Sequence, residues 1–95
     1  MRHEIILAPE AVQDLERLPA NVRAKVKDAI QAHLRHEPTK VSRSRIKRLK
    51  GLDQPQFRLR VDDVRVFYDV AAKQVQILAI VNKPDAAAWL AKVGE

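Results

Sequence analysis

The chain has 95 residues, 46% of them hydrophobic, which is the size of one folded domain, and we treat residues 1–95 as a single domain. It contains no cysteine, which excludes disulfide frameworks, zinc–thiolate sites and cysteine nucleophiles. The 18 Lys and Arg residues outnumber the 12 Asp and Glu residues, and the resulting net charge of +6 favours anionic partners.

The first half of the chain predicts a strand followed by two helices. Residues 4–8 form a short apolar run that ends at Pro9, which suits a strand followed by the first turn of a helix. Apolar residues then recur at helical spacing up to Pro19, which ends that helix, and Asn21 is expected to cap the next one. The second helix is amphipathic and ends before Pro38. Such a helical hairpin must lay its apolar stripe on a sheet.

The second half predicts four strands and a last helix. The strand segments are residues 46–49, 57–61, 64–70 and 75–81. The last of these is apolar on both faces in its second half, which is typical of a central strand. Pro84 then opens a helix from Asp85 to Lys92. The order β-α-α-β-β-β-β-α predicts an α+β fold, in which an N-terminal strand and a helical hairpin pack on a mostly antiparallel, twisted sheet with a short C-terminal helix.

The positive charge is concentrated in the middle of the chain. Residues 35–60 contain nine basic and two acidic residues, a net charge of +7, and the remainder contains nine basic and ten acidic residues, a net charge of −1. Such a concentrated field is typical of nucleic-acid binding or of docking to an acidic protein. A solvated basic loop is the alternative. Because no segment resembles a signal peptide or a membrane-spanning helix, we expect a soluble, cytoplasmic protein without a membrane partner.

The dipeptide Asp62-Asp63 predicts a two-residue turn between two alternating strands. Pairing outward from this turn places Arg60 opposite Arg65 and Arg58 opposite Phe67, all on one face, while the apolar residues of both strands form the core face. A one-residue bulge at the turn would scatter this cluster.

Three guanidinium groups on one face repel one another, which a fold tolerates where an anion normally lies among them. Guanidinium groups bind phosphate through two donors at once, and the ring of Phe67 offers a surface on which a base could stack. The basic segment supplies further candidates for RNA binding: Arg45, Lys47, Arg48 and Lys50. The alternative is a solvated strand face with Phe67 packed on a helix.

Other kinds of site have little support in the sequence. The histidines at positions 3, 33 and 36 lack the spacing of metal ligands, and we expect His33 to be structural and His36 to be exposed. The chain has no Gly-x-Ser-x-Gly motif and no glycine-rich phosphate loop, and the two adjacent aspartates suit a turn better than a catalytic carboxylate pair. We therefore expect no metal and no small-molecule cofactor.

The chain resembles the RelE/ParE superfamily of bacterial toxins in Leu49-Lys50-Gly51 and in the stretch FRLRVDDVRVFYDV of residues 57–70. The opening ILAPEA of residues 6–11 also matches, so the resemblance covers nearly the whole chain. It implies a toxin that is held inactive by an acidic antitoxin protein. RelE-like members of the superfamily cleave mRNA on the ribosome without a metal, by activating the ribose 2′-OH against the adjacent phosphate.

On this resemblance the catalytic residues would be Arg58, Arg60, Arg65 and Lys83. Arg58 and Arg60 would hold the RNA backbone, and one of them is a candidate for proton transfer. Arg65 would stabilise the pentavalent phosphorane, an electrostatic role that usually contributes most to the rate. Lys83 occupies the basic position after the last strand.

The chain also departs from the family pattern after the last strand. Many relatives carry a His-Arg pair there and a Tyr a few residues later, whereas this chain reads Asn82-Lys83-Pro84, with Trp89 two positions later than that Tyr. No candidate at the site has a pKa near neutrality, so the general base is unidentified. Three interpretations stay open: a ribosome-dependent mRNA endoribonuclease, a ParE-like inhibitor of DNA gyrase without nuclease activity, or a degenerate member that survives as a binding module. The four retained basic residues favour the first.

Overall fold

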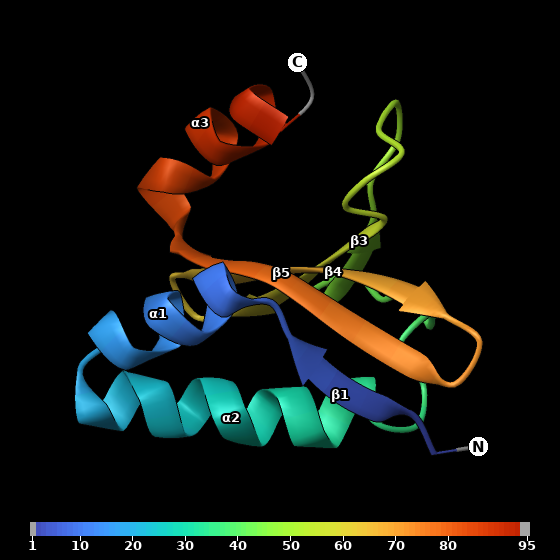
Figure 1. The fold of residues 1–95 in the computed structure, drawn as a ribbon, viewed down its shortest axis with the longest axis horizontal. Coiled ribbons are helices and arrows are strands. Elements are labelled where there is room, and N and C mark those ends of the chain that lie inside the picture. Colours follow the sequence, from blue (N-terminus) through green and yellow to red (C-terminus); the bar gives the residue numbers. More distant parts are fainter. Residues whose placement is uncertain (1, 94–95) are drawn as a thin grey trace.

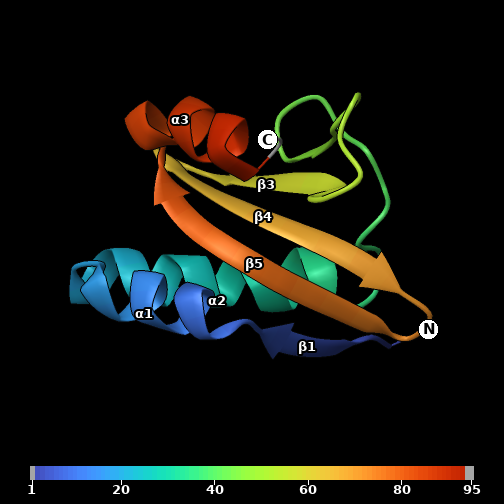
Figure 2. The same cartoon turned by 45° about the horizontal axis from the view of Figure 1, so that its top comes forward.

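A computed structural model describes residues 2–93, and its elements follow the predicted order (Figure 1). They are β1 Glu4–Leu7, α1 Pro9–Arg17, α2 Ala20–Leu34, β2 Ile46–Arg48, β3 Phe57–Val61, β4 Val64–Ala71, β5 Gln74–Asn82 and α3 Lys83–Val93. The helices α1 and α2 cover one face of the sheet, and α3 lies on the opposite side (Figures 1 and 2). None of these helices has the length and apolar character that crossing a membrane requires.

The five strands form one twisted sheet in the order β1-β5-β4-β3-β2 (Figure 2). The strand β1 pairs parallel with β5, and the other neighbouring pairs are antiparallel. The predicted α+β fold with a mostly antiparallel sheet is therefore confirmed. The strand β5, predicted to be central, has a neighbour on each side, and β4 occupies the middle of the sheet.

The β3–β4 hairpin has the predicted register, without a bulge: Arg60 pairs with Arg65, and Arg58 pairs with Phe67. Asp62 begins the turn with φ 52°, a left-handed conformation that aspartate tolerates better than most residues. A bulge lies instead between β4 and β5, where Leu78 is the extra residue. This bulge turns both neighbouring isoleucines of β5, at positions 77 and 80, toward the core.

The core lies between the sheet and the pair α1–α2. Its fully buried members include Tyr68, Leu34, Leu59, Ile77 and Val26. The Tyr68 ring stacks on Phe57, with 5.5 Å between ring centroids, and its hydroxyl donates a hydrogen bond of 2.6 Å to the carbonyl oxygen of Pro38. The polar connection after α2 is thereby attached to the central strand.

The tight turn between α1 and α2 differs from the prediction. The helix α2 begins at Ala20 with Pro19 at the N-cap position and no side-chain cap, so the predicted cap by Asn21 is wrong. Arg23 instead reaches back across the turn, donating from Nε to the Leu15 carbonyl at 3.2 Å and from Nη2 to the Leu18 carbonyl at 3.0 Å. The Leu15 carbonyl also accepts the backbone N–H of Leu18, so Arg23 adds a second bond there and gives the carbonyl of the C-cap residue Leu18 a partner.

Candidate nucleic-acid interface

The sheet face opposite to α1 and α2 carries four basic side chains from neighbouring strands. Lys47 of β2 pairs with Arg58 of β3, and Arg60 pairs with Arg65 of β4. Because residues paired across strands share a face, the register alone places these groups together. We call the four residues Lys47, Arg58, Arg60 and Arg65 the basic face.

The three arginines of the basic face differ in their surroundings. Arg60 is exposed, Arg58 is half-buried, and Arg65 is only 6% exposed. The Nη1 group of Arg65 donates to the carbonyl oxygens of Asp62 at 2.7 Å and Val64 at 3.1 Å. Arg65 therefore braces the hairpin turn, a role that was not predicted, and brings its positive charge next to Arg58.

Arg58 has the least favourable surroundings of the three arginines. Its burial lowers the pKa of its guanidinium group, and the positive charges of Arg65 and Arg60 lower this pKa further. Its Nε group is buried and has no hydrogen-bond partner among residues 2–93. A buried donor without a partner typically costs about 1–3 kcal/mol, and more for a charged group. An anion bound between the arginines would accept a hydrogen bond from this Nε group and would reduce the repulsion between the positive charges.

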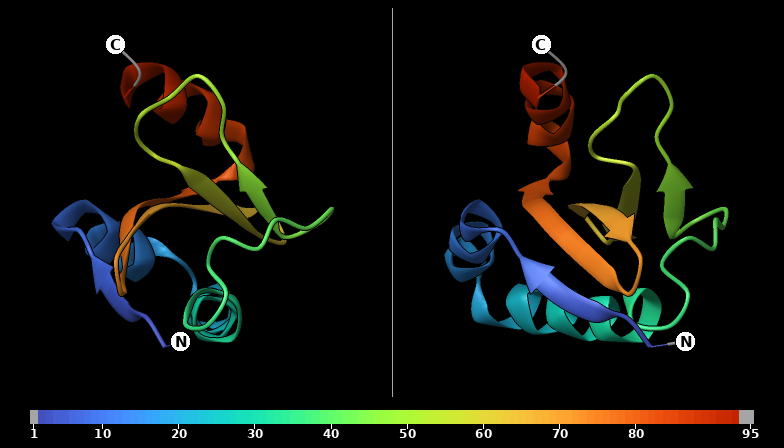
Figure 3. Two further views of the ribbon diagram at one scale, coloured as in Figure 1. Left: turned by 90° about the vertical axis from the view of Figure 1, so that its right-hand side faces the viewer. Right: turned by 45° about the vertical axis from the view of Figure 1, so that its right-hand side comes forward.

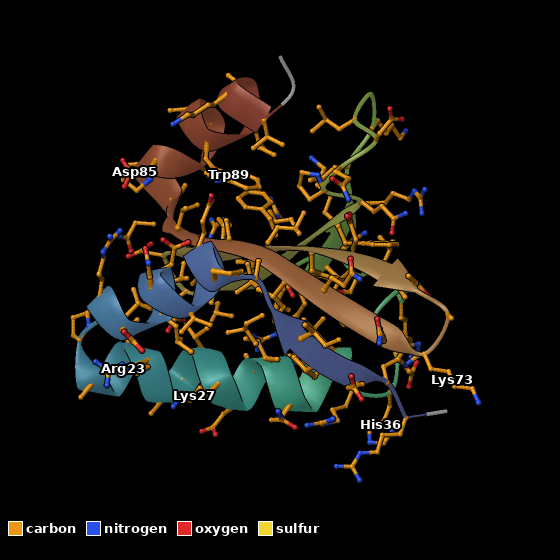
Figure 4. All side chains as sticks on the ribbon, viewed as in Figure 1. Arg23, Lys27, His36, Lys73, Asp85 and Trp89 are labelled. Atoms are coloured by element: carbon orange, nitrogen blue, oxygen red, sulfur yellow. The ribbon has the colours of Figure 1, made fainter. Side chains whose placement is uncertain are left out.

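Phe67 lies beside Arg58 on this face but is completely buried. Trp89 of α3 covers it, with the two rings 4.8 Å apart between centroids and 12° from parallel. Figure 4 shows Trp89 pointing from α3 toward the sheet. The expectation that the Phe67 ring is open for a base to stack on is therefore wrong for this arrangement, and the alternative, that it packs on a helix, is correct.

Asp69 is a buried carboxylate on the same face that sequence analysis did not single out; it is 6% exposed. Its Oδ1 accepts the backbone N–H of Gln56, and its Oδ2 accepts the side-chain amide of Gln54, both at 2.7 Å. These bonds attach the loop before β3 to β4, and Figure 3 shows this loop rising from the sheet on the same side as α3. The only signal in the sequence was an acidic residue inside a strand whose other members, apart from Arg65, are hydrophobic or aromatic.

The remaining predicted residues lie around the basic face without joining it. Lys83 is exposed at the start of α3, and its backbone N–H donates at 2.6 Å to the Asp63 carbonyl of the same hairpin turn. Arg48 points to the other side of the sheet, where its guanidinium lies 5.1 Å from the centre of the Phe57 ring. Arg45 and Lys50 are exposed on either side of β2.

A cavity of about 670 Å³ lies away from the basic face. It opens between the α1–α2 turn and the β3–β4 turn, and its lining includes Leu18, Val22, Ile80 and Asp85. A cavity of this size suits a small ligand, whereas an exposed basic surface suits a charged polymer. The basic face is the candidate interface because the Arg58 donor without a partner lies there. Within the described chain, no three His, Asp or Glu side chains gather as a metal ion would require.

The fold and this face together define a small α+β protein with a helical hairpin on one side of its sheet and the basic face on the other. The family model described as "ParE toxin of type II toxin-antitoxin system, parDE" matches residues 5–84. The chain therefore belongs to this family of the RelE/ParE superfamily and is a toxin of the type II toxin–antitoxin class. The resemblance seen in the sequence is confirmed. No curated protein matched the chain significantly.

Solved structures of related toxins have the same fold. The toxin–antitoxin complex RelBE2 from Mycobacterium tuberculosis matches with a TM-score of 0.74 and 24% identity, over 86% of this chain and 99% of that one. The archaeal RelE–RelB complex from Pyrococcus horikoshii OT3 matches with a TM-score of 0.70 and 23% identity, over 87% and 97%. A mutant of E. coli toxin RelE in the free state matches with a TM-score of 0.71 and 18% identity, over 98% and 95%.

Proposed function

We propose that this toxin is a ribosome-dependent mRNA endoribonuclease that works without a metal and inhibits translation. The observation that carries the proposal is the buried Nε group of Arg58, which has no partner among the described residues and lies close to two further arginines. The scissile phosphate of RNA would supply the missing acceptor and offset the crowded positive charge. The superfamily resemblance supplies the reaction type.

In the proposed reaction the ribose 2′-oxygen attacks the adjacent phosphorus while its proton passes to the surrounding water, and the bond from phosphorus to the 5′-oxygen breaks. The products are a 2′,3′-cyclic phosphate and a 5′-hydroxyl. Positive charge held close to the phosphate stabilises the pentavalent phosphorane. Because its pKa is lowered, the Arg58 guanidinium is a better proton donor than an ordinary arginine, and we assign it to protonating the leaving 5′-oxygen.

The hydrogen bonds of Arg65 change the role that the resemblance implied for it. Since its Nη1 is used on the turn, Arg65 contributes mainly through its charge and by bracing the hairpin. Arg60 is exposed and free to contact the phosphate directly. Lys83 lies at the same turn, where it would contact a more distant part of the RNA backbone.

The ribosome enters the proposal because the basic face lacks a general base. Its four side chains are arginine and lysine, so none takes up a proton readily at neutral pH. Positioning must then supply much of the rate, and a ribosome that holds the codon with its 2′-OH in line can provide it. We expect the purified toxin to cut mRNA on programmed ribosomes and to leave naked RNA nearly intact.

The partner that controls the toxin is proposed to be an acidic antitoxin protein in the cytoplasm. The net charge of +6 and the basic face favour an acidic segment. The RelBE2 and P. horikoshii structures are themselves toxin–antitoxin complexes. We expect the antitoxin segment to lie over the basic face or to displace α3, whose residues are all at least partly exposed within the described range.

A ParE-like inhibitor of DNA gyrase is the second candidate, favoured by the match to the ParE toxin family model and by the partly covered basic face. Trp89 covers Phe67, and Arg65 is turned toward the hairpin, so only part of the implied nuclease surface is open. This candidate needs no phosphate transfer at the basic face. It predicts DNA breaks in a gyrase assay and intact mRNA on ribosomes.

Mapping mRNA cuts on programmed ribosomes, with a gyrase assay in parallel, tests the proposal. We expect Arg58→Ala to slow cleavage about 10²–10³-fold, by comparison with the loss of one donor to a developing anion. The matched control is Lys27→Ala, which removes an exposed charge on α2, on the other side of the molecule (Figure 4). Full activity of a folded Arg58→Ala variant, or gyrase poisoning without mRNA cuts, would overturn the nuclease assignment.

A further inference from the structure

A groove of about 300 Å³ lies at the end of α2, away from the hairpin turn. It is formed by the end of α2, the connection that follows, and the residue before β2. Figure 4 shows His36 at this end of the helix. Its polar lining consists of His33, His36, Glu37, Lys40, Ser42 and Arg45. The proposed reaction uses none of the histidines.

The charge of this groove depends on pH. Lys40 pairs with Glu37 at 3.3 Å, and Arg45 has no acidic partner within 4.0 Å among residues 2–93. With neutral imidazoles, these three side chains give a net charge of +1. Since histidine ordinarily becomes charged as the pH falls below about 6.5, protonation of both imidazoles would raise the net charge to +3.

Hydrogen bonds hold the donors of this groove in place. The Oγ of Ser42 accepts the backbone N–H groups of Arg45 at 3.1 Å and Ile46 at 3.2 Å, which occupies both of its lone pairs. Its own hydrogen is therefore left to donate to another acceptor. The Arg45 carbonyl accepts the Arg60 N–H at 2.8 Å, which attaches this residue to β3 and so to the edge of the basic face.

We propose that this groove binds a second backbone phosphate of single-stranded RNA, and that protonation of His33 and His36 strengthens the binding. A hydroxyl donor, a guanidinium group and two imidazoles form a donor set that suits a phosphate diester. The identity of the polymer rests on the proposed function. Arg45 lies next to both sites, because it lines the groove and its carbonyl oxygen accepts the N–H of Arg60 of the basic face. One RNA strand that passes over the edge strand β2 would therefore contact both sites.

The groups that set the pH dependence come from each element around the groove. The two histidines come from the end of α2, Glu37 and Lys40 from the connection, and Arg45 from the residue before β2. Arginine and lysine ordinarily keep their charge between pH 5.5 and pH 8. The affinity that the basic face contributes is therefore expected to stay constant in this range.

The test is binding of a short oligodeoxynucleotide to the full chain at low ionic strength, followed through the imidazole NMR signals. The probe lacks the 2′-OH and cannot be cleaved, and its diester charges do not change in this pH range. We expect the His33 and His36 signals to move and the His3 signal to stay. We also expect binding at least about tenfold tighter at pH 5.5 than at pH 8, from the added charges.

Variants separate this groove from the basic face. The double variant His33→Gln/His36→Gln should lose the pH dependence and keep the affinity at pH 8. The single variant His36→Gln, at an exposed residue, should lose part of the pH dependence. Arg60→Gln should weaken binding equally at both pH values, and His3→Gln should change neither. If the ratio of the affinities at pH 5.5 and pH 8 is unchanged in both histidine variants, the groove is not the binding site. If inorganic sulfate competes as well as a second oligonucleotide does, the RNA assignment is overturned. Neither result depends on ribosomal cleavage, so failure here and failure of the nuclease proposal are distinguishable.

Discussion

The rings of Phe67 and Trp89 stack 4.8 Å apart, and this contact joins the central strand of the sheet to the C-terminal helix. Phe67 is fully buried by it, whereas α3 contributes no fully buried residue of its own within the described range. A helix held by so little burial is expected to open at a lower free energy than the rest of the fold.

Removing either ring should therefore release α3 and leave the sheet folded. Because Trp89 is the only tryptophan, its fluorescence reports on α3 alone. We expect Phe67→Ala to shift this emission to the red and Trp89→Ala to speed amide hydrogen exchange in α3. The loss of the stack itself is expected to cost about 0.5–1.5 kcal/mol beyond the lost burial. Val12→Ala, at an exposed apolar residue of α1, is the control. Unchanged exchange in α3 would show that other contacts hold the helix.

Arg65 and Arg60 pair across the hairpin, and their substitutions should separate stability from activity. Arg65→Ala removes two hydrogen bonds that brace the turn, so we expect it to lower the free energy of unfolding by about 1–3 kcal/mol as well as to slow cleavage. Arg60→Ala alters an exposed side chain and should stay within about 0.5 kcal/mol of the parent while cleavage falls. Urea unfolding and ribosomal cleavage measure the two effects. Equal destabilisation by both variants would contradict the bracing role of Arg65.

Tyr68 should make the protein sensitive to alkali. Burial raises the pKa of its phenol, so the folded state holds this proton more tightly than the unfolded state does. The stabilisation is complete below the ordinary tyrosine pKa of about 10 and is lost as the pH rises above it. Since Tyr68 is the only tyrosine, phenolate absorbance follows it alone, and we expect ionisation to coincide with alkaline unfolding. Tyr68→Phe should abolish that component, and a midpoint near 10 in a still folded protein would contradict the prediction.

Binding of the proposed acidic antitoxin should depend on salt through its association rate. The Debye length shortens from about 10 Å at 0.1 M to about 3 Å at 1 M ionic strength, which screens charge steering toward the basic face. We expect Arg60→Glu to slow association and to weaken its salt dependence more than Lys27→Glu, which carries the same change of charge on α2. Stopped-flow mixing measures both. Equal rates at low and high salt would remove the electrostatic part of the partner assignment.

The sequence by itself determined the order of the elements and placed the three arginines of the basic face together, whereas Lys47 joins them through the pairing of β2 with β3. A two-residue turn at Asp62-Asp63, flanked by strict alternation, is enough to predict that Arg60 meets Arg65 and Arg58 meets Phe67. These features follow from local spacing, because side chains alternate between the two faces of a strand whatever the rest of the chain does.

Tertiary structure decided what covers that face and which donors remain free on it. Alternation in β4 could not show that Trp89 would fold back onto Phe67, because that contact depends on the direction in which α3 leaves the sheet. Nor could it show that the Nη1 of Arg65 would donate to the carbonyl oxygen of Asp62 in the turn. It also could not show that the Nε of Arg58 would have no partner among the described residues. Local periodicity settles which residues share a face, whereas burial and hydrogen bonding depend on segments that are distant in sequence and meet only when the chain is packed.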